Sequence, residues 1–232
     1  MSKQIAIIED EPLIAQNYAD ALQRLGYRVH CYTDRPSALQ AFAGRLPDLA
    51  IIDVGLGADV EGGFELCREL RSRSPRLPII FLTARDSELD VISGLRLGAD
   101  DYLTKDISLA QMTTRIVTLF RRVDALRDDA ATDESLRQGP LLIDAQRMRI
   151  SWRDQAVELT VTEFWITHAL ARHPGHVKNR QQLMDAANLV LDDHTITSHI
   201  KRIRRKFQQV DSEFQAIQTA YGLGYRWQTP CA

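Results

Sequence analysis

The stretch Leu49-Ala50-Ile51-Ile52-Asp53 is a short apolar run that ends in a carboxylate. Three similar runs in the first half of the chain are also followed by polar groups, namely Glu9 and Asp10, Thr83, and Lys105. Apolar runs of this length are typical of parallel strands that are buried on both faces. If the runs are strands of one sheet, these groups meet at its carboxyl edge, where open α/β sheets bind ligands.

The periodicity around these runs predicts an α/β fold. Strand-like runs lie near residues 4–8, 28–32, 48–53, 78–83 and 100–104, and helical patterns lie near 12–25, 35–44, 62–73, 86–97 and 108–122. Five strand–helix units in series predict a doubly wound, flavodoxin-like parallel sheet of five strands, in the order 2-1-3-4-5.

The residue types at the predicted edge suit phosphoryl transfer. The Asp53 carboxylate can attack phosphorus and become an acyl phosphate. Mg²⁺, the expected cofactor, prefers oxygen ligands, which Asp10 and Asp53 supply. The Glu9 carboxylate, acting through a water molecule, and the Gly55 carbonyl complete the expected ligand set.

Two further groups at this edge complement the carboxylates. A hydroxyl hydrogen bond from Thr83 and the positive charge of Lys105 would stabilise phosphoryl oxygens by positioning and electrostatics. Taken singly, each residue is more common at a strand end, a helix cap or the surface. Their combination at four strand ends favours a phosphorylation site over these structural roles.

Length and composition predict two domains. The chain has 232 residues, of which 44% are hydrophobic, and this is enough for two cores. The three cysteines, Cys31, Cys67 and Cys231, are too scattered for a disulfide framework or a zinc site. No apolar stretch approaches the roughly 18 residues of a membrane span, and the first residues do not have a signal-peptide pattern. We therefore expect a cytoplasmic protein without a membrane partner.

Charge is distributed unevenly along the chain. Residues 1–120 carry 13 Lys and Arg against 17 Asp and Glu, residues 121–138 carry 4 against 5, and residues 139–232 carry 12 against 9. Only the last segment has the net positive charge that is expected of a domain that binds a polyanion.

The second half has the element order of a winged helix-turn-helix. Strand-like segments near 140–144, 147–151 and 155–159 precede a helix that opens at Thr160, helices near 179–187 and 194–208, and two strand-like pieces around 221–224. Thr160 and Glu163 have the spacing of a capping box, and Pro174-Gly175 would stop that first helix. Polar residues before this half predict a linker. The predicted domains are therefore residues 1–122 and 139–232, with a linker at 123–138.

The helix near 194–208 combines an apolar stripe with a basic surface. The stripe, which is expected to pack on the core, consists of Ile196, Ile200, Ile203 and Phe207. Five of the six residues at 201–206 are basic, and the residues predicted to project away from the stripe are Ser198, Lys201, Arg202 and Arg205. Such a helix can enter the major groove of double-stranded DNA and contact bases and phosphates. For a basic run taken alone, a solvated amphipathic helix is the alternative.

Motifs of the first half resemble the receiver domains of two-component response regulators. They are Ile8-Glu9-Asp10-Glu11-Pro12, Asp53, Leu82-Thr83-Ala84-Arg85 and Leu97–Lys105. The resemblance implies that a sensor histidine kinase transfers a phosphoryl group to Asp53, and that Glu9 and Asp10 help to hold the metal. The residues implied to report the phosphorylated state are Thr83, Tyr102 and Lys105.

The second half resembles the OmpR/PhoB-type effector domain in residues 159–164, 173–180, 199–206 and 219–227. The two resemblances together cover nearly the whole chain. They imply a phosphorylation-activated DNA-binding transcriptional regulator, not an enzyme, with RNA polymerase as a further candidate partner. The residues expected to contact DNA are Thr195, Thr197, Ser198, His199, Lys201, Arg202, Arg204, Arg205 and Tyr221.

The resemblance also implies that the phosphorylated receiver forms a homodimer through its fourth and fifth helices. Asp100 and Asp101 of one subunit would pair with Arg122 and Arg115 of the other. A third pair that is usual in the family has no counterpart, since its positions are Val91 and Gln111.

Three departures from the family pattern affect the expected activity. Asp106 stands where the family usually has Pro after its Lys, and the loop after Asp53 is longer, with Gly57 where Pro is common. Both predict slower or weaker phosphorylation rather than its loss. In the wing, Tyr221 replaces an Arg that reaches the minor groove, and tyrosine does not supply the positive charge that a narrow minor groove attracts.

Two other functions stay open on the sequence alone. Haloacid-dehalogenase phosphatases also use a strand-end Asp, Mg²⁺, Thr and Lys, but they need a second Asp where this chain has Gly55. The other alternative is a phosphorylation-independent regulator whose receiver serves only for dimerisation, as Asp106 and Gly57 suggest. The sequence names neither the kinase and its signal nor the target promoters, and it does not say whether binding activates or represses.

Overall fold

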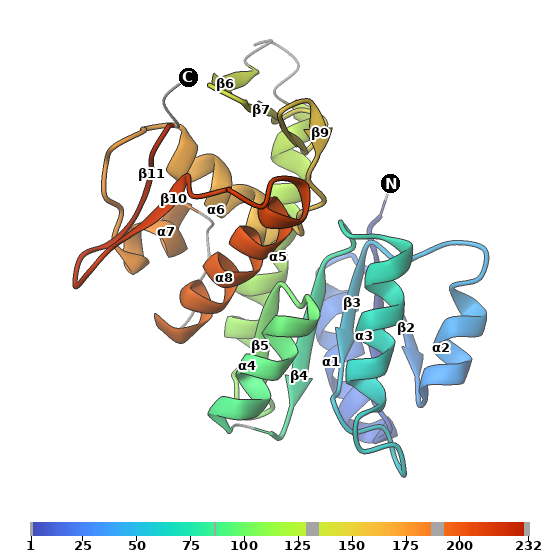
Figure 1. Cartoon of the computed structure of the whole chain (residues 1–232). Helices are drawn as coiled ribbons and strands as arrows, with labels where there is room; N and C mark the ends of the chain where they lie inside the picture. Colours follow the sequence, from blue (N-terminus) through green and yellow to red (C-terminus); the bar gives the residue numbers. More distant parts are fainter. Residues whose placement is uncertain (1, 86, 129–134, 187–192, 230–232) are drawn as a thin grey trace. The chain divides into compact units, whose positions relative to one another are not determined.

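The chain forms two compact units, residues 1–114 and 115–232. The computed structural model describes residues 2–85, 87–128, 135–186 and 193–229 (Figure 1). Within these ranges, no helix is both long enough and apolar enough to cross a membrane.

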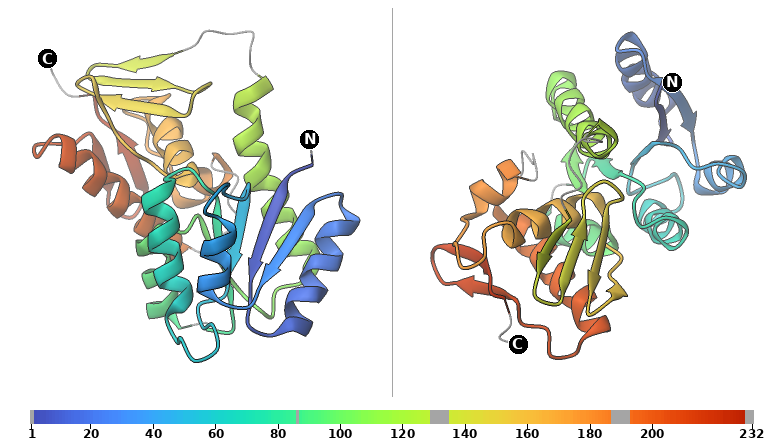
Figure 2. Two further views of the ribbon diagram at one scale, coloured as in Figure 1. Left: turned by 90° about the vertical axis from the view of Figure 1, so that its right-hand side faces the viewer. Right: turned by 90° about the horizontal axis from the view of Figure 1, so that it is seen from above.

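The first unit is built on a five-stranded parallel sheet with helices on both faces (Figure 2). Its elements in chain order are β1 (Gln4–Ile8), α1 (Pro12–Arg24), β2 (Arg28–Tyr32), α2 (Arg35–Ala41), β3 (Leu49–Ile52), α3 (Gly62–Arg73), β4 (Ile79–Thr83), α4 (Glu88–Leu97), β5 (Asp101–Thr104) and the start of α5 (Leu109–Asp128). The strand order is β2-β1-β3-β4-β5 and all pairs are parallel, which confirms the predicted doubly wound sheet.

Strand side chains alternate between two buried layers. Ile8, Ile52 and Phe81 belong to one apolar cluster with residues of α2, α3 and α4. Their neighbours Ile7 and Ile51 are also buried, at 1% and 2% exposed, but lie outside that cluster. Burial on both faces explains why these strands are almost continuously apolar in sequence. Each such side chain stabilises the fold by about 1.5–3 kcal/mol.

The second unit combines a small antiparallel sheet, three helices and a hairpin. After the rest of α5, its elements are β6 (Leu136–Gln138), β7 (Leu141–Asp144), β8 (Arg149–Trp152), β9 (Gln155–Ala156), α6 (Val161–Ala171), α7 (Arg180–Ala186), α8 (Asp193–Val210), β10 (Ile217–Ala220) and β11 (Gly224–Trp227). Strands β6 to β9 form the sheet, and β10 pairs with β11 in the hairpin. This is the winged helix-turn-helix order that the sequence predicted.

An aromatic cluster joins the parts of the second unit. Trp152 of β8 lies edge-on to Phe207 of α8, to Phe214 and to Trp227 of β11, with ring centroids 4.9–6.0 Å apart. Edge-to-face pairs of this kind stabilise a core by about 0.5–1.5 kcal/mol beyond the area that they bury. Asp211 also accepts a hydrogen bond of 2.7 Å from the Trp152 indole. The helix α8 and the hairpin are therefore fixed to the same core.

The structure differs from the predicted linker, residues 123–138, at both ends. Helix α5 continues to Asp128, since Ala125, Leu126 and Arg127 are good helix formers and no Gly or Pro interrupts them. At the other end, residues 136–138 form β6, which pairs with β7. The middle of the predicted linker, residues 129–134, lies outside the described residues.

Candidate functional site

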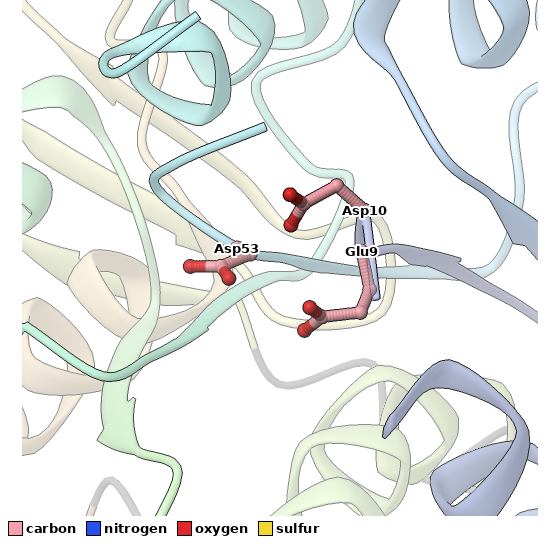
Figure 3. A group of neighbouring side chains, drawn as sticks. All are labelled: Glu9, Asp10 and Asp53. Carbon is pink, nitrogen blue, oxygen red and sulfur yellow. The ribbon is translucent and has the colours of Figure 1, made fainter. Parts of the chain in front are cut away.

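Three carboxylates lie together at the carboxyl edge of the sheet in the first unit (Figure 3). Glu9 and Asp10 follow β1 and Asp53 follows β3, and the pairing of Ile8 with Ile52 brings these strand ends side by side. One oxygen of each carboxylate lies within 4.8 Å of the other two. Glu9 and Asp53 are 2% and 8% exposed. Clustered oxygen donors of this kind fit a hard cation such as Mg²⁺.

Lys105 balances this negative charge. Its Nζ lies 2.7 Å from Asp53 Oδ2 and 2.8 Å from Glu9 Oε1. Burial opposes the charge of the ammonium group, but hydrogen bonds to Asp53 and Glu9 outweigh burial and raise the pKa of Lys105. Burial and the neighbouring Asp53 charge raise the pKa of Glu9 despite its contact with Lys105. The lysine therefore stays charged and holds the nucleophile candidate in place.

The loop that follows Asp53 reaches the same site. Leu56 and Asp59 exchange backbone hydrogen bonds of 3.0 and 3.1 Å, which close a tight turn, and Gly57 has the left-handed φ of 63°. The Gly57 N–H donates to Asp10 Oδ2 at 3.0 Å. The added loop residues are thus folded into a turn that contacts one of the expected metal ligands. Gly55 is half-buried at the start of this loop.

Gly63 permits the close approach of α3 to the end of β3. Its N–H donates to the Val54 carbonyl at 2.9 Å. A Cβ at this position would lie 1.9 Å from the carbonyl oxygen of Asp53, which no side chain can do without moving the backbone.

Thr83 and Tyr102 are linked through Arg85. The Arg85 N–H donates to Thr83 Oγ1 at 3.4 Å, and the Tyr102 hydroxyl donates to the Arg85 carbonyl at 2.9 Å. The Arg85 side chain donates to the Val60 carbonyl at 2.8 Å and lies 3.6 Å from Asp90 of α4. The sequence motif that contains Arg85 does not predict these contacts, because they depend on how residues distant in sequence, such as Val60 and Tyr102, fold around it.

The predicted pair between Asp100 and Arg122 of a second subunit is contradicted by the structure, because Asp100 is not accessible. Asp100 is fully buried; its Oδ2 lies 2.7 Å from Arg71 Nη2 and accepts a hydrogen bond of 3.1 Å from the Ile79 N–H. Asp101 is 3% exposed and accepts from the Tyr102 N–H. Both carboxylates thus have partners within one chain. Arg115 is half-buried, and the side chain of Arg122 lies outside the described residues.

In the second unit, α8 presents fewer basic side chains than its sequence suggests. The predicted stripe of Ile196, Ile200, Ile203 and Phe207 is buried, as expected. Lys201 and Arg205 are exposed. The prediction that Ser198 and Arg202 project to solvent is wrong, since they are 8% and 9% exposed.

Glu163 of α6 is the partner of Arg202. Its Oε1 lies 2.8 Å from Arg202 Nη2, and its Oε2 lies 2.6 Å from Lys206 Nζ. Glu163 also completes the capping box with Thr160, which confirms that prediction. Burial opposes ionisation of this carboxyl group, yet the charges of Arg202 and Lys206 prevail and lower its pKa to about 2. The ion pairs of Glu163 with Arg202 and Lys206 therefore fix α8 against the start of α6.

Arg204 connects α8 to the hairpin. Its guanidinium donates to the Ile217 carbonyl at 2.9 Å and to Thr219 Oγ1 at 2.9 Å, both on β10. Thr197 Oγ1 lies 3.3 Å from the Tyr225 hydroxyl. His199 is fully buried, so its predicted contact with DNA is contradicted by burial in the core. The side chain of Thr195 lies outside the described residues, and Tyr221 is exposed at the hairpin turn.

Both halves match known protein families. Residues 5–117 match the family described as "Response regulator receiver domain", and residues 154–227 match "Transcriptional regulatory protein, C terminal". The chain is 37% identical over 229 residues to the transcriptional regulatory protein BaeR of Escherichia coli, covering 97% of this chain and 92% of that protein. It is also 37% identical over 222 residues to the transcriptional regulatory protein CreB of Escherichia coli, covering 94% and 95%.

Solved structures share this fold. A RitR mutant superposes with a TM-score of 0.76 at 22% identity, over 99% of this chain and 100% of that one. The response regulator DrrB of Thermotoga maritima, described as an OmpR/PhoB homolog, has a TM-score of 0.53 at 25% identity, over 98% and 100%.

Proposed function

Because this chain belongs to the response regulators that join a receiver domain to an OmpR/PhoB-type DNA-binding domain, we propose that phosphorylation of Asp53 controls its binding to DNA. The observation that carries the proposal is the contact of Asp53 with Lys105, at 2.7 Å, beside Glu9 and Asp10. Phosphoryl transfer needs a nucleophile, positive charge and ligands for a metal ion. Asp53, Lys105 and the two other carboxylates offer these groups at one edge of the sheet.

In the proposed reaction, Asp53 takes a phosphoryl group from a histidine of a sensor kinase. The phosphorus–nitrogen bond of the donor breaks as an Asp53 oxygen–phosphorus bond forms, and the released imidazole takes up a proton. Glu9, Asp10 and Asp53 would hold Mg²⁺, which when bound offsets charge on the phosphoryl oxygens. A carboxylate attacks phosphorus without losing a proton to a base, so the proposed reaction uses no general base.

Lys105 and Thr83 are the groups that would respond to the phosphoryl group. Lys105 would move from the Asp53 carboxylate to a phosphoryl oxygen, keeping its charge paired. The Thr83 hydroxyl, which now accepts from the Arg85 N–H, would donate to another phosphoryl oxygen. Since the Arg85 carbonyl also accepts from Tyr102, the change at Thr83 has a direct route to that ring.

The purified chain, mixed with a small phosphodonor and Mg²⁺, tests the reaction. One phosphoryl group per chain is expected by intact-mass measurement, and Asp53→Asn should carry none. Equal labelling of Asp53→Asn would contradict the assignment of the nucleophile. Release of many phosphates per chain from added substrates would instead favour the phosphatase alternative.

A regulator that does not depend on phosphorylation is a second candidate, favoured by one contact. Asp10 is already engaged by the Gly57 N–H at 3.0 Å, in a loop that is longer than the family pattern. If this contact persists in the presence of Mg²⁺, metal binding and labelling would both be weak. Calorimetric titration with Mg²⁺, compared between the wild type and Asp10→Asn, distinguishes the two: a receiver that is active loses its metal-binding heat in the variant, whereas a receiver that serves only for dimerisation has none to lose.

The proposal includes a cytoplasmic site of action and a homodimer of the phosphorylated form, with RNA polymerase as a further partner. Arg115 and Asp101 are the remaining candidates for a pair between subunits, after Asp100 is assigned to Arg71. Because Asp101 is 3% exposed and Arg115 is half-buried, such a pair would form only if the Asp101 carboxylate becomes accessible in the phosphorylated form. Sedimentation with and without phosphodonor should show an increase in dimer; an unchanged monomer would contradict it.

A further inference from the structure

The Asp10 carboxylate is held in a different way from the two carboxylates beside it. Lys105 Nζ contacts Asp53 and Glu9, at 2.7 and 2.8 Å. Within the described residues, Asp10 instead accepts a hydrogen bond from a backbone group, the Gly57 N–H, at 3.0 Å. One oxygen of each carboxylate lies within 4.8 Å of the other two (Figure 3). Because like charges repel at this distance, a donor to Asp10 helps to keep it beside the other two.

Gly57 can donate because of the turn in which it lies. Leu56 and Asp59 exchange backbone hydrogen bonds of 3.0 and 3.1 Å, so Gly57 and Ala58 are the central residues of this turn. Gly57 has a positive φ of 63° and Ala58 does not have a positive φ, which is the pattern of a type II′ turn. Glycine is favoured at the first central position of that turn. A Cβ at Gly57 would meet no atom within 4 Å, so its cost would come from the backbone conformation alone.

Two side-chain contacts fix the loop that carries this turn. Arg35 Nη2, at the start of α2, lies 3.6 Å from Asp59 Oδ2. Arg85, which follows β4, donates to the Val60 carbonyl at 2.8 Å. The backbone N–H of the turn is therefore presented to the carboxylate by a loop that is held at two further points.

A contact of this kind can either compete with a metal ion or position its ligand. The phosphorylation-independent regulator would require competition. The structure favours positioning, because the three carboxylate oxygens already converge while the contact is made. The two oxygens of a carboxylate also have about four lone-pair sites. Asp10 can therefore accept from the Gly57 N–H on Oδ2 and still offer a lone pair to a metal ion.

We propose that the Gly57 N–H is a positioning group for the metal site, which holds Asp10 in the orientation that binds Mg²⁺ and stays bonded to it when the ion is present. This inference rests on the proposed function, in which Asp10 is a metal ligand. Hydrogen-bonded partners of metal ligands typically change metal affinity by about 10- to 100-fold. Proline, which is common at this position in the family, has no N–H and could not make the contact. For metal binding, this departure from the family pattern is then a gain.

Calorimetric titration of the full chain with Mg²⁺, without a phosphodonor, tests the proposal. The variants are Gly57→Ala, which opposes the positive φ, and Gly57→Pro, which also removes the N–H. Gly26→Ala is the matched control, since Gly26 has a φ of 88° and a Cβ there would also meet no atom within 4 Å. Gly26 lies between α1 and β2, at the other edge of the sheet. Thermal unfolding of each variant is measured first, because replacing a left-handed glycine destabilises a chain.

Amide exchange of the wild type gives a second readout, which does not depend on how the variants fold. With isotope-labelled glycine, the twelve glycines give a simple NMR spectrum, and the signal that is lost in Gly57→Ala identifies Gly57. If the Gly57 N–H stays bonded to Asp10, its exchange with water does not accelerate as Mg²⁺ saturates the chain. If the contact competes with the ion, exchange becomes faster.

The proposal predicts weaker Mg²⁺ binding in both Gly57 variants. We expect a loss of about fivefold or more in Gly57→Ala, from the cost of a left-handed φ, and of about tenfold or more in Gly57→Pro. Gly26→Ala should bind Mg²⁺ as the wild type does, and exchange of the Gly57 N–H should not accelerate.

Two kinds of result would overturn the proposal, and they are distinguishable. Positioning is wrong if the Gly57 variants bind Mg²⁺ as tightly as the wild type, if Gly26→Ala loses as much affinity as they do, or if Mg²⁺ accelerates exchange of the Gly57 N–H. Labelling of Asp53 can still occur in each of these cases, so the proposed function survives. A wild type that binds no Mg²⁺ would instead overturn the metal site itself, and the positioning role with it.

Discussion

Gly63 sets the distance between α3 and the strand that carries Asp53. Because a Cβ there would lie 1.9 Å from the Asp53 carbonyl oxygen, Gly63→Ala must displace either α3 or the backbone at Asp53. We expect a loss of about 3 kcal/mol of stability or more, at the upper end of overpacking, and slower labelling of Asp53. Denaturant unfolding followed by circular dichroism measures the first effect.

Gly44→Ala is the matched control, since Gly44 is exposed and no atom lies within 4 Å of the added Cβ. It should be as stable as the wild type. Equal stability of Gly63→Ala and Gly44→Ala would show that α3 can move away without cost.

Single residues differ in how far the sequence could predict them. The positions of Glu9, Asp10, Asp53 and Lys105 follow from strand periodicity, because the ends of parallel neighbours meet at one edge. Arg202 could not be placed in the same way. One apolar stripe suggested one buried face of α8, yet a second face, with Ser198 and Arg202 four residues apart, is also buried. Glu163, the partner of Arg202, is distant in sequence. The pattern of polar residues along a helix does not show which of them will be buried.

At the scale of elements, the contact between α6 and α8 gives Arg202 a structural role, because its guanidinium pairs with Glu163. Arg202→Ala removes one of the two cations that face the buried Glu163 carboxylate. Removing one member of a buried pair typically costs 3–5 kcal/mol, and since Lys206 remains we expect about 3 kcal/mol. DNA affinity should fall by a similar factor for all sequences, with little change in its salt dependence, because Arg202 contacts Glu163 and not a phosphate.

Lys201→Ala is the comparison on the same helix. Because Lys201 is exposed, its loss should leave stability within about 0.5 kcal/mol and reduce the salt slope of binding. A stable Arg202→Ala chain that loses preference at one base pair only would return Arg202 to the role of a base-reading residue.

The same contact predicts how stability depends on pH. The pKa of Glu163 in the folded chain is about 2, below its ordinary value of 4.5. The resulting stabilisation is fully present above about pH 4.5 and is lost as the pH falls toward 2; it amounts to about 3 kcal/mol. Glu163→Gln removes it, so the gap in stability between the two chains should be constant above that pH and should narrow below it.

Tryptophan fluorescence reports unfolding of the second unit selectively, since Trp152, Trp165 and Trp227 all lie there. It therefore measures the difference in free energy of unfolding between the two chains. A gap that stays constant down to pH 3 would mean that the carboxylate is not stabilised by Arg202 and Lys206.

The sequence predicted best those elements whose packing or capping leaves a regular pattern of residue types. The five parallel strands and the capping box of α6 were found because burial and capping leave regular signatures in sequence. The end of α5 and strand β6 were missed. Both are short or polar, and β6 depends on backbone pairing of Leu136 with Ile143, which no local pattern encodes.

At the scale of the whole molecule, an acidic receiver domain is joined to a basic DNA-binding domain. The first 120 residues carry more acidic than basic groups, and the last 94 carry more basic ones. Phosphorylation adds negative charge to the half that does not meet DNA, so direct repulsion from the duplex is not required for control. In the proposed mechanism, the change would instead pass through the contacts of Thr83, Arg85 and Tyr102 to the surface that is proposed to pair two subunits.

The most direct test measures duplex affinity for the wild type and for Asp53→Ala, each with and without a small phosphodonor and Mg²⁺. We predict that the donor tightens wild-type binding by about tenfold, within the usual range of coupling between sites, and leaves Asp53→Ala unchanged. An equal response of the two chains, or no response of the wild type once its labelling is verified, would contradict control of DNA binding by Asp53.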